Sequence, residues 1–439
     1  MKLLLSTLIG LIALAWGFDV MTTDYSARML WILRQELMYL SGVLAIGMMS
    51  LAMLLSARPG WLERPLGGLD RMYLTHKWAG ILAGLFAFTH WFSKSIIGDI
   101  LKATIGKEGK MHREKFEGLW GLVQGVGKEA GEWAFYILLA MILLALWRRF
   151  PYHLWRIVHR AMPAIYLALV FHALMMAPTA YWRQPLGWLL LALFAAGVYG
   201  SLTALGGHIG RGRRHAGKIL ALEPIAPNLL KLRCQMEADW PGHQPGQFAF
   251  LQFAGREGGH PFTIASASRA DRTLDFYIKA LGDYTRRLQH GLKEGQSLGV
   301  EGPYGCFQPP REQSGKRPLW VAGGIGITPF LAWLDALGAD PARAPAAELH
   351  YCTHDGVGDP LVQRLHELCA ALPAIRLYVY GSEQGKRLEA GALRPEPGDR
   401  RRTEVWFCGP PGLAKALRKA LEETLDGEFG FHHEVFALR

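Results

Sequence analysis

The sequence predicts a multidomain protein: a six-helix transmembrane bundle, then a small antiparallel β-barrel, then a doubly wound α/β domain. Three observations support this fold class. Up to about residue 207 the chain contains apolar runs of 16 or more residues, whereas later apolar runs are short. Two of the long runs each contain a pair of histidines, and the last third alternates strand-like and helix-like segments around glycine-rich turns. We therefore expect domains at residues 1–210, 215–312 and 316–439.

Charge and cysteine content narrow the class of protein. The 439-residue chain has a formal net charge of +11, but its positive charge lies largely in short loops beside the apolar runs. This distribution indicates membrane topology and argues against nucleic-acid binding. The five cysteines are scattered through the later half without CxxC spacing, which suits a reducing cytoplasm better than a disulfide framework: Cys234, Cys306, Cys352, Cys369 and Cys408.

Six segments approach the ~20 apolar residues that a bilayer requires. They cover residues 3–18, 38–57, 72–97, 131–147, 156–177 and 185–206. The first could instead be a signal peptide, because Lys2 precedes it and Ala13-Leu14-Ala15 offers a cleavage site. We expect a retained first span, since a bundle follows at once.

Basic residues in the short loops set the orientation. They follow the second, fourth and sixth spans: Arg58, Arg64, Arg71, Arg148, Arg149, Arg156, Arg211, Arg213, Arg214 and Lys218. These loops should face the cytoplasm, whereas the mixed-charge loop at 98–130 should face outside. The protein is therefore expected to be a multi-pass protein of the cell inner (plasma) membrane with both C-terminal domains in the cytoplasm.

Four histidines in the third and fifth spans are candidate metal ligands. His76 and His90 are 14 residues apart, and His159 and His172 are 13 apart. Both spans start at the cytoplasmic face, so His76 and His159 should share one level and His90 and His172 another, roughly 20 Å away. Ionisable residues in a membrane usually mark function, and bis-histidine ligation of heme iron favours electron transfer. We expect two heme b groups, since CxxCH is absent; packing or interfacial histidines are the alternative.

The spacing in the fifth span requires a departure from ideal helix geometry. Fourteen residues at about 100° each return to within ~40° of the same face, but thirteen give about 220°. Pro163 lies between His159 and His172, and proline kinks a helix. We expect a bend there that turns both histidines to one surface.

Residues 215–312 contain short strands between turns, the pattern of a small antiparallel barrel. Four motifs occur in it, His260-Pro261-Phe262-Thr263, Tyr277-Ile278-Lys279, Gly282-Asp283-Tyr284-Thr285 and Gly302-Pro303-Tyr304-Gly305. They resemble the flavin-binding motifs of the ferredoxin-NADP reductase superfamily, in the variant typical of ferric reductases and NADPH oxidases. The resemblance implies an FAD site. Pro261, Phe262 and Thr263 would line the isoalloxazine, and His260 and Lys279 would face the phosphates. It also implies roles for Tyr277, Gly282, Thr285 and Gly302.

Residues 318–439 alternate strands and helices, which predicts a parallel doubly wound sheet. A strand ends in a glycine-rich turn before a helix, an arrangement that cradles phosphate; its residues are Gly323, Gly324, Gly326, Thr328 and Pro329. The segment Cys408-Gly409-Pro410 resembles the family's second nucleotide motif, at the nicotinamide end. Ser382, Lys386 and Arg387 follow another strand and could hold a 2′-phosphate. With no acidic residue clearly placed for a ribose hydroxyl, NADPH is favoured over NADH.

Across nearly the whole chain the resemblance is to the ferric reductase and NADPH oxidase superfamily of transmembrane flavocytochromes b. It implies an NAD(P)H-dependent transmembrane oxidoreductase. Electrons would pass from cytoplasmic NADPH through FAD and two b-type hemes to an extracytoplasmic acceptor. Molecular oxygen, giving superoxide, or a ferric chelate is the expected acceptor. The alternative is an electron-supply module for a periplasmic protein partner or a quinone.

Four residues are expected near the redox chemistry. Arg34 matches an arginine that flanks the oxygen site of NADPH oxidases. Lys94 stands one turn after His90, where those enzymes have a histidine. A lysine there could stabilise superoxide, attract a ferric chelate, or extend to the membrane interface. Cys408 would lie at the nicotinamide, and Phe436 matches an aromatic that stacks on the flavin.

Overall fold

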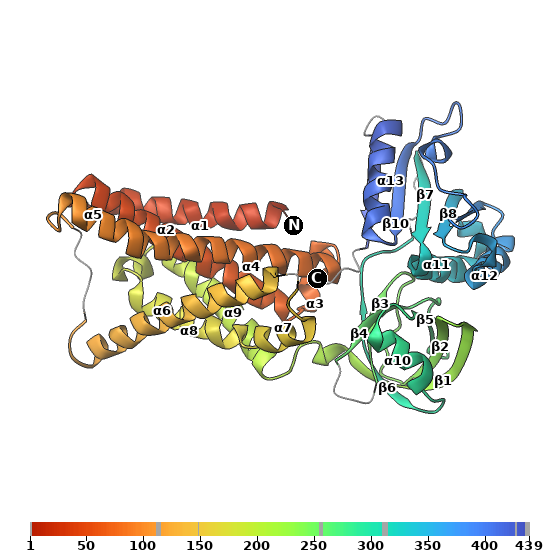
Figure 1. Cartoon of the computed structure of the whole chain (residues 1–439), viewed down its shortest axis with the longest axis horizontal. Helices are drawn as coiled ribbons and strands as arrows, with labels where there is room; N and C mark the ends of the chain where they lie inside the picture. Colours follow the sequence, from red (N-terminus) through yellow and green to blue (C-terminus); the bar gives the residue numbers. More distant parts are fainter. Residues whose placement is uncertain are drawn as a thin grey trace. The chain divides into compact units, whose positions relative to one another are not determined.

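The computed structural model describes residues 2–110, 116–147, 149–253, 258–309, 315–425 and 428–434. The chain forms two compact units, residues 1–66 with 71–209 and residues 67–70 with 210–439. Among the described residues, the secondary structure of the first unit is entirely helical, and the second unit is built on two sheets (Figure 1).

The helices of the first unit follow the predicted spans with added short segments. Their bounds are α1 (Lys2–Thr22), α2 (Met29–Ser56), α3 (Gly60–Leu66), α4 (Leu69–Phe92), the π-helix η1 (Ser93–Ile97), α5 (Gly98–Ile105), α6 (Gly118–Leu146), α7 (Tyr152–His159), α8 (Met162–Met176), η2 (Thr179–Arg183) and α9 (Pro185–Leu205).

Five helical segments among the described residues are long and apolar enough to cross a membrane: Lys2–Thr22, Met29–Ser56, Leu69–Ile105, Leu154–Met176 and Pro185–Leu205. They coincide with five of the six predicted spans. The predicted fourth span falls on α6, a helix of 29 residues. Its first half carries Lys128, Glu129 and Glu132, and it is not among the five.

Helix α2 forms the centre of the first unit. Most of its second half is buried, and it packs against α1, α8 and α9. Small residues allow the close approach: a Cβ on Gly200 of α9 would lie 2.2 Å from the Met53 carbonyl oxygen. The buried Ser50 hydroxyl lies 2.8 Å from that of Tyr166 on α8. Small residues and buried hydroxyl pairs are typical of helix packing in membranes.

The helix between His159 and His172 is interrupted, as the thirteen-residue spacing requires. Helix α7 ends at His159 and α8 starts at Met162, with Pro163 in its first turn. Proline is tolerated there because its missing N–H would have no partner inside the helix. A second irregularity, the π-helix η1, starts three residues after His90; such segments are frequent at functional sites.

The second unit contains two sheets in sequence (Figure 1). The first comprises β1 (Arg214–Ala226), β2 (Leu229–Met236), β3 (Phe248–Gln252), β4 (His260–Thr263), β5 (Thr273–Lys279) and β6 (Ser297–Tyr304), with α10 (Asp283–Gly291). The second comprises β7 (Lys316–Gly323), β8 (Ala347–Thr353), β9 (Ile375–Gly381), β10 (Arg402–Cys408) and β11 (Phe429–His433), with α11 (Thr328–Gly338), α12 (Pro360–Ala370) and α13 (Pro411–Thr424). The turns η3 (Arg211–Arg213), η4 (Gly324–Ile327), η5 (Pro341–Arg343), η6 (Gly356–Gly358) and η7 (Ala390–Leu393) connect them.

The first sheet is antiparallel, in the order β4-β3-β6-β1-β2-β5. Alternate residues of its strands point into one apolar core, as Leu232, Phe276 and Val300 do. This alternation is what a sheet with one buried face requires.

The second sheet is parallel, in the order β11-β10-β7-β8-β9. Strand β7 is buried along nearly its whole length, as expected when helices cover both faces. The strand order reverses between β7 and β10, and ligands of such sheets bind at the carboxyl ends of the strands at this switch point. Gly323 and Cys408 are the residues that end these two strands.

Candidate functional site

The structure brings the four predicted ligand histidines together in two pairs. The ring centres of His90 and His172 are 6.3 Å apart, with the planes at 88°. Those of His76 and His159 are 6.2 Å apart, at 81°. Two imidazoles bound to one ion at about 2.0 Å each, with about 1.2 Å from nitrogen to ring centre, would place their centres about 6.4 Å apart. Both pairs therefore have room for one shared metal ion.

Hydrogen bonds set the tautomer of three of these histidines. The Nδ1 atom of His76 lies 2.8 Å from the Ala52 carbonyl oxygen, that of His90 2.8 Å from Met38, and that of His172 3.0 Å from Gly127. A carbonyl only accepts, so Nδ1 carries the hydrogen and Nε2 presents a lone pair. A metal-binding histidine usually donates its other ring N–H to such an acceptor, which fixes the orientation of the ring.

His159 is held by a ring contact. Its imidazole stacks on Trp155 of the same helix, with centres 4.6 Å apart and planes at 20°. The stacked indole limits rotation of the His159 ring, so its orientation is also fixed.

The His90–His172 pair opens into a cavity. Its walls are mainly apolar, including Val43, Phe135 and Leu169. Glycines leave room for the rings, since a Cβ on Gly131 would lie 2.0 Å from His172 Nδ1. The paired nitrogens, the apolar walls and the glycines together fit a planar apolar macrocycle with axial histidines.

Arg34 and Lys94 occupy different positions beside this cavity. Arg34 donates from Nε to the Ser93 carbonyl oxygen at 2.8 Å and from Nη2 to that of Lys94 at 2.7 Å, both in the π-helix. Lys94 lines the cavity and pairs with Glu132 of α6 at 3.1 Å. Arg34 therefore stabilises the π-helix η1. Lys94 lines the cavity, and its positive charge is paired with Glu132.

The motif His260-Pro261-Phe262-Thr263 forms the edge strand β4 of the first sheet and contacts both β3 and α10. Strand β4 pairs with β3 so that Phe262 stands opposite Ala249 and Thr263 opposite Phe248. The His260 ring stacks on Tyr284 of α10, with centres 3.6 Å apart. Pro261 lies between His260 and Phe262 on β4. This stacking joins the start of β4 to the first turn of α10.

The start of α10 is organised by Thr285. Its Oγ1 accepts hydrogen bonds from the backbone N–H groups of Leu281, at 3.0 Å, and Gly282, at 3.1 Å. Lys279 ends β5 three residues before Gly282. A helix N-terminus, a lysine and His260 suit a pyrophosphate. Gly302, by contrast, lies in β6 and packs against Ala249 of β3.

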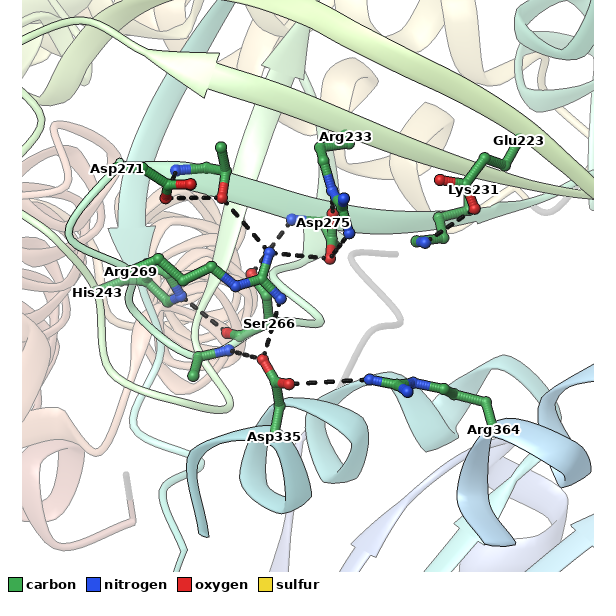
Figure 2. A network of polar contacts seen from close by, with 12 residues as sticks. Glu223, Lys231, Arg233, His243, Ser266, Arg269, Asp271, Asp275, Asp335 and Arg364 are labelled. Atoms are coloured by element: carbon green, nitrogen blue, oxygen red, sulfur yellow. Dashed lines mark hydrogen bonds and ion pairs between the residues drawn. The ribbon is translucent and has the colours of Figure 1, made fainter. Parts of the chain in front are cut away.

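Tyr277 lies in the junction between the two sheets of the second unit, where it packs against the core of the α/β part. The same junction contains an ionic network (Figure 2). Asp275 accepts two hydrogen bonds from Arg233, at 2.7 and 3.0 Å. Arg269 links Asp275 to Asp335 of α11, at 3.2 Å to each. Burial alone would raise the pKa of Asp275, but the two arginines outweigh it and hold that pKa below its ordinary value.

The nucleotide motifs meet at the switch point of the parallel sheet. A Cβ on Gly326 would lie 2.3 Å from the Cys408 carbonyl oxygen, and one on Gly323 would lie 2.8 Å from Pro410. Gly324 has a φ of +54°, which favours glycine. Thr328 and Pro329 open α11, and Gly409 lies against Gly323. The turns after β7 and β10 thus form one backbone surface, and only glycine allows their approach.

Glu434 is a further residue of this site, and no sequence motif marked it. This side chain is buried, and neither carboxyl oxygen has a hydrogen-bond partner among the described residues. Burial raises its pKa well above the ordinary value. Burial, with a contribution from Glu434, also raises the pKa of the Cys408 thiol. The predicted Phe436 lies outside the described residues. Glu434 stands two positions before it in the sequence. This acidic residue in an otherwise apolar segment was the signal that could have pointed to Glu434.

Acidic residues lie beside Ser382, one of the residues expected to hold a 2′-phosphate. Ser382 Oγ lies 3.1 Å from His354 Nδ1, and Glu383 pairs with His354 Nε2 at 3.0 Å. The ligand atoms of His354, Asp355 and Glu383 lie within 4.8 Å of one another. These residues follow β8 and β9 at their carboxyl ends, and Lys386 and Arg387 are exposed a few residues on.

Two family models match the chain. One, described as a ferric reductase like transmembrane component, matches residues 41–170, and the other, an FAD-binding domain, matches residues 214–308.

Several curated proteins are similar to part of the chain. The reductase component of propane 2-monooxygenase from Rhodococcus jostii (strain RHA1) is 25% identical over 47% of this chain and 59% of its own length. The carnitine monooxygenase reductase subunit of Escherichia coli (strain K12) is 31% identical over 35% of this chain and 45% of its own length. The chain thus spans about half the length of these relatives. A solved ferredoxin NADP+ reductase from Neisseria gonorrhoeae, with bound FAD and NADP, has a TM-score of 0.42 and 19% identity, covering 50% of this chain and 98% of its own.

Proposed function

Because the chain belongs to the ferric reductase/NADPH oxidase superfamily, we propose that it carries electrons across a membrane through two bis-histidine hemes. It is a membrane flavin oxidoreductase that transfers electrons from NAD(P)H via FAD. The proposal adds the two hemes, their ligands and the direction of transfer. The positively charged loops support a cytoplasmic second unit, so that electrons leave the cytoplasm.

The observation that carries this proposal is the pairing of four histidines at two levels of one helical unit. Both pairs have the separation that a shared ion requires, 6.2 and 6.3 Å between ring centres. Three of the four have Nδ1 engaged by a backbone carbonyl. Histidines that only fill space would have no reason to fall into two pairs with this spacing, or to share this tautomer in three of the four.

When bound, FAD would take a hydride from NAD(P)H and release single electrons, which the hemes would carry. In the second unit, the glycine turns after β7 and β10 would admit the dinucleotide, and Thr263 and Phe262 would hold the flavin ring. Glu434 and Cys408 would stay uncharged beside the nicotinamide, since burial raises both pKa values. Uncharged groups there would leave the positive charge of the oxidised ring unpaired and so favour its release.

The test is anaerobic reduction of the purified chain in detergent, followed by rapid mixing. NAD(P)H should bleach the flavin first and then reduce both hemes. His76→Leu should stop heme reduction while flavin bleaching continues. His90→Leu should leave one heme reducible. Heme reduction in His76→Leu, or reduction of two hemes in His90→Leu, would refute the assigned ligands.

A further inference from the structure

A group of carboxyl and tyrosine side chains, three of them buried and two half-buried, lies beside the cavity of the His90–His172 pair. It consists of Asp19, Tyr25, Glu36, Tyr39 and Tyr181, referred to below as the carboxyl–tyrosine cluster. Asp19 is 4% exposed, Glu36 9% and Tyr181 2%. Three segments supply these residues: α1 with the loop after it, the next helix α2, and η2, which lies far away in the sequence. Ionisable groups placed so deeply in a membrane unit usually have a function.

Glu36 is the best-connected member of the cluster. Its Oε2 accepts a hydrogen bond from Trp16 Nε1 of α1 at 3.1 Å, and its carboxyl also bonds the Tyr25 hydroxyl. Arg34, on the same helix, bonds backbone carbonyls, and Lys94 pairs with Glu132. Glu36 is thus held by neutral donors.

The cluster also contains unused polar atoms. Asp19 Oδ1 and the Tyr181 hydroxyl have no hydrogen-bond partner among the described residues. Tyr181 is nevertheless close enough to Glu36 and Asp19 to interact with both. A buried polar atom without a partner is costly, so it usually bonds a water or a ligand.

The cluster connects the cavity to the surface. Tyr39 and Tyr181 pack edge to face, with ring centres 6.0 Å apart, and both line the cavity that holds His90 and His172. At the opposite end, Gln184 Nε2 donates to the hydroxyl of the exposed Thr22 at 3.2 Å, three residues after Asp19. Polar groups therefore extend from the surface through the carboxyls to the cavity wall.

We propose that the carboxyl–tyrosine cluster delivers protons to an acceptor reduced by the heme that His90 and His172 would hold, and that the acceptor is a quinone. This inference rests on the proposed function, which supplies the electrons. Reducing oxygen to superoxide or Fe³⁺ to Fe²⁺ consumes no proton, so a buried proton path would serve neither. A quinone, in contrast, consumes one proton for each electron that it takes up.

The reaction balances with the groups named. NAD(P)H is oxidised to NAD(P)⁺, giving up two electrons and one proton on its own side of the membrane. The quinone gains those two electrons, and each of its two carbonyl oxygens takes a proton from the cluster and becomes a hydroxyl. Glu36 and Asp19 regain their protons from the solvent near Thr22.

The test separates proton transfer from electron transfer. The intact chain in detergent is reduced anaerobically with NAD(P)H and mixed with a short-chain benzoquinone or with ferricyanide, which takes an electron without a proton. Heme reoxidation is followed by absorbance. Glu36→Gln and Asp19→Asn should slow reoxidation by the quinone about 100-fold, the low end of general-acid effects. Reoxidation by ferricyanide should stay within about twofold of wild type, since that oxidant needs no proton.

A control and a second readout make the result specific. Glu63→Gln removes another buried carboxyl, in α3 after the far end of α2, and should leave both rates unchanged. Redox-difference infrared spectra should show a carboxylic C=O band that Glu36→Gln removes and Glu63→Gln keeps.

Equal slowing with both oxidants, or no slowing with the quinone, would overturn the proton path. Wild-type hemes that the quinone does not oxidise would overturn the quinone assignment. If NAD(P)H fails to reduce the hemes, the proposed function fails. The hemes can then be reduced with dithionite, and their reoxidation by the quinone and by ferricyanide still tests the carboxyl–tyrosine cluster.

Discussion

Gly131 offers a selective test of the His90–His172 pair, because its missing side chain makes room for the His172 ring. Replacing it by alanine would place a Cβ 2.0 Å from Nδ1, 2.4 Å from Cγ and 2.5 Å from Cε1 of His172. Nonbonded carbon atoms prefer about 3.5–4.0 Å. The imidazole would therefore have to move by more than about 1 Å, whereas metal–ligand distances tolerate about 0.2 Å.

Gly131→Ala should thus lose the His90–His172 heme and keep the His76–His159 heme. The assay is heme per chain by pyridine hemochrome, with the reduced absorbance spectrum as a second measure; the expected ratio falls from two to one. Gly125→Ala is the matched control on the same helix, since a Cβ there meets nothing within 4 Å. It should keep two hemes and gain up to about 1 kcal/mol of helix stability.

Two results would refute this reasoning. Gly131→Ala with two hemes would mean that His172 does not ligate at the position described. Loss of both hemes, with normal folding by circular dichroism, would mean that the two sites are not separate.

Three further predictions concern the second unit. Asp275→Asn should lower the unfolding free energy by about 2 kcal/mol, because it leaves two partly exposed arginines without their shared carboxylate. The pKa of Asp275 is lowered in the folded state. The wild-type protein should therefore unfold at a higher temperature than Asp275→Asn above about pH 4, the ordinary value for Asp, and this difference should vanish as the pH falls further. A difference that grows in acid would contradict this. Glu383→Lys should raise kcat/KM for NADPH relative to NADH by about tenfold, because a lysine replaces a carboxylate that repels a 2′-phosphate; an unchanged ratio would remove Glu383 from the ribose site. Cys408, buried and with a raised pKa, should resist maleimide at pH 8 while the exposed Cys306 reacts, as mass spectrometry of the intact protein would show; rapid labelling of Cys408 would contradict its burial.

The histidine pairs could be predicted because their physics is local. Helical rise and periodicity, together with loop charge, place His76 with His159 and His90 with His172 without any tertiary information. The conflict between thirteen residues and an ideal helix pointed to Pro163, and the structure has the break two residues before it.

In the second unit the motifs could be predicted from the sequence, but the residues that each side chain contacts could not. The strand–turn–helix around Gly323 and Gly326 follows from sequence alone. That Tyr277 lies in the junction with α11 and α12 depends on how the two sheets pack, which no strand pattern encodes.

Groups assembled from distant segments escaped the sequence analysis. Asp19 and Tyr181 lie 162 positions apart, and only helix packing brings them to Glu36. Glu383 was likewise not recognised beside Ser382, because its partner His354 belongs to the loop after a different strand. Such sites depend on pairing between elements, whereas composition and periodicity describe single elements.

The most direct test of the two-heme pathway is the heme content of the wild-type chain together with its electron paramagnetic resonance spectrum. Two hemes per chain, both low-spin with two nitrogen ligands, and each lost separately in His76→Leu and His90→Leu, are the predicted result. One heme per chain, or a high-spin iron with an open position, would contradict the assignment of four histidines to two irons.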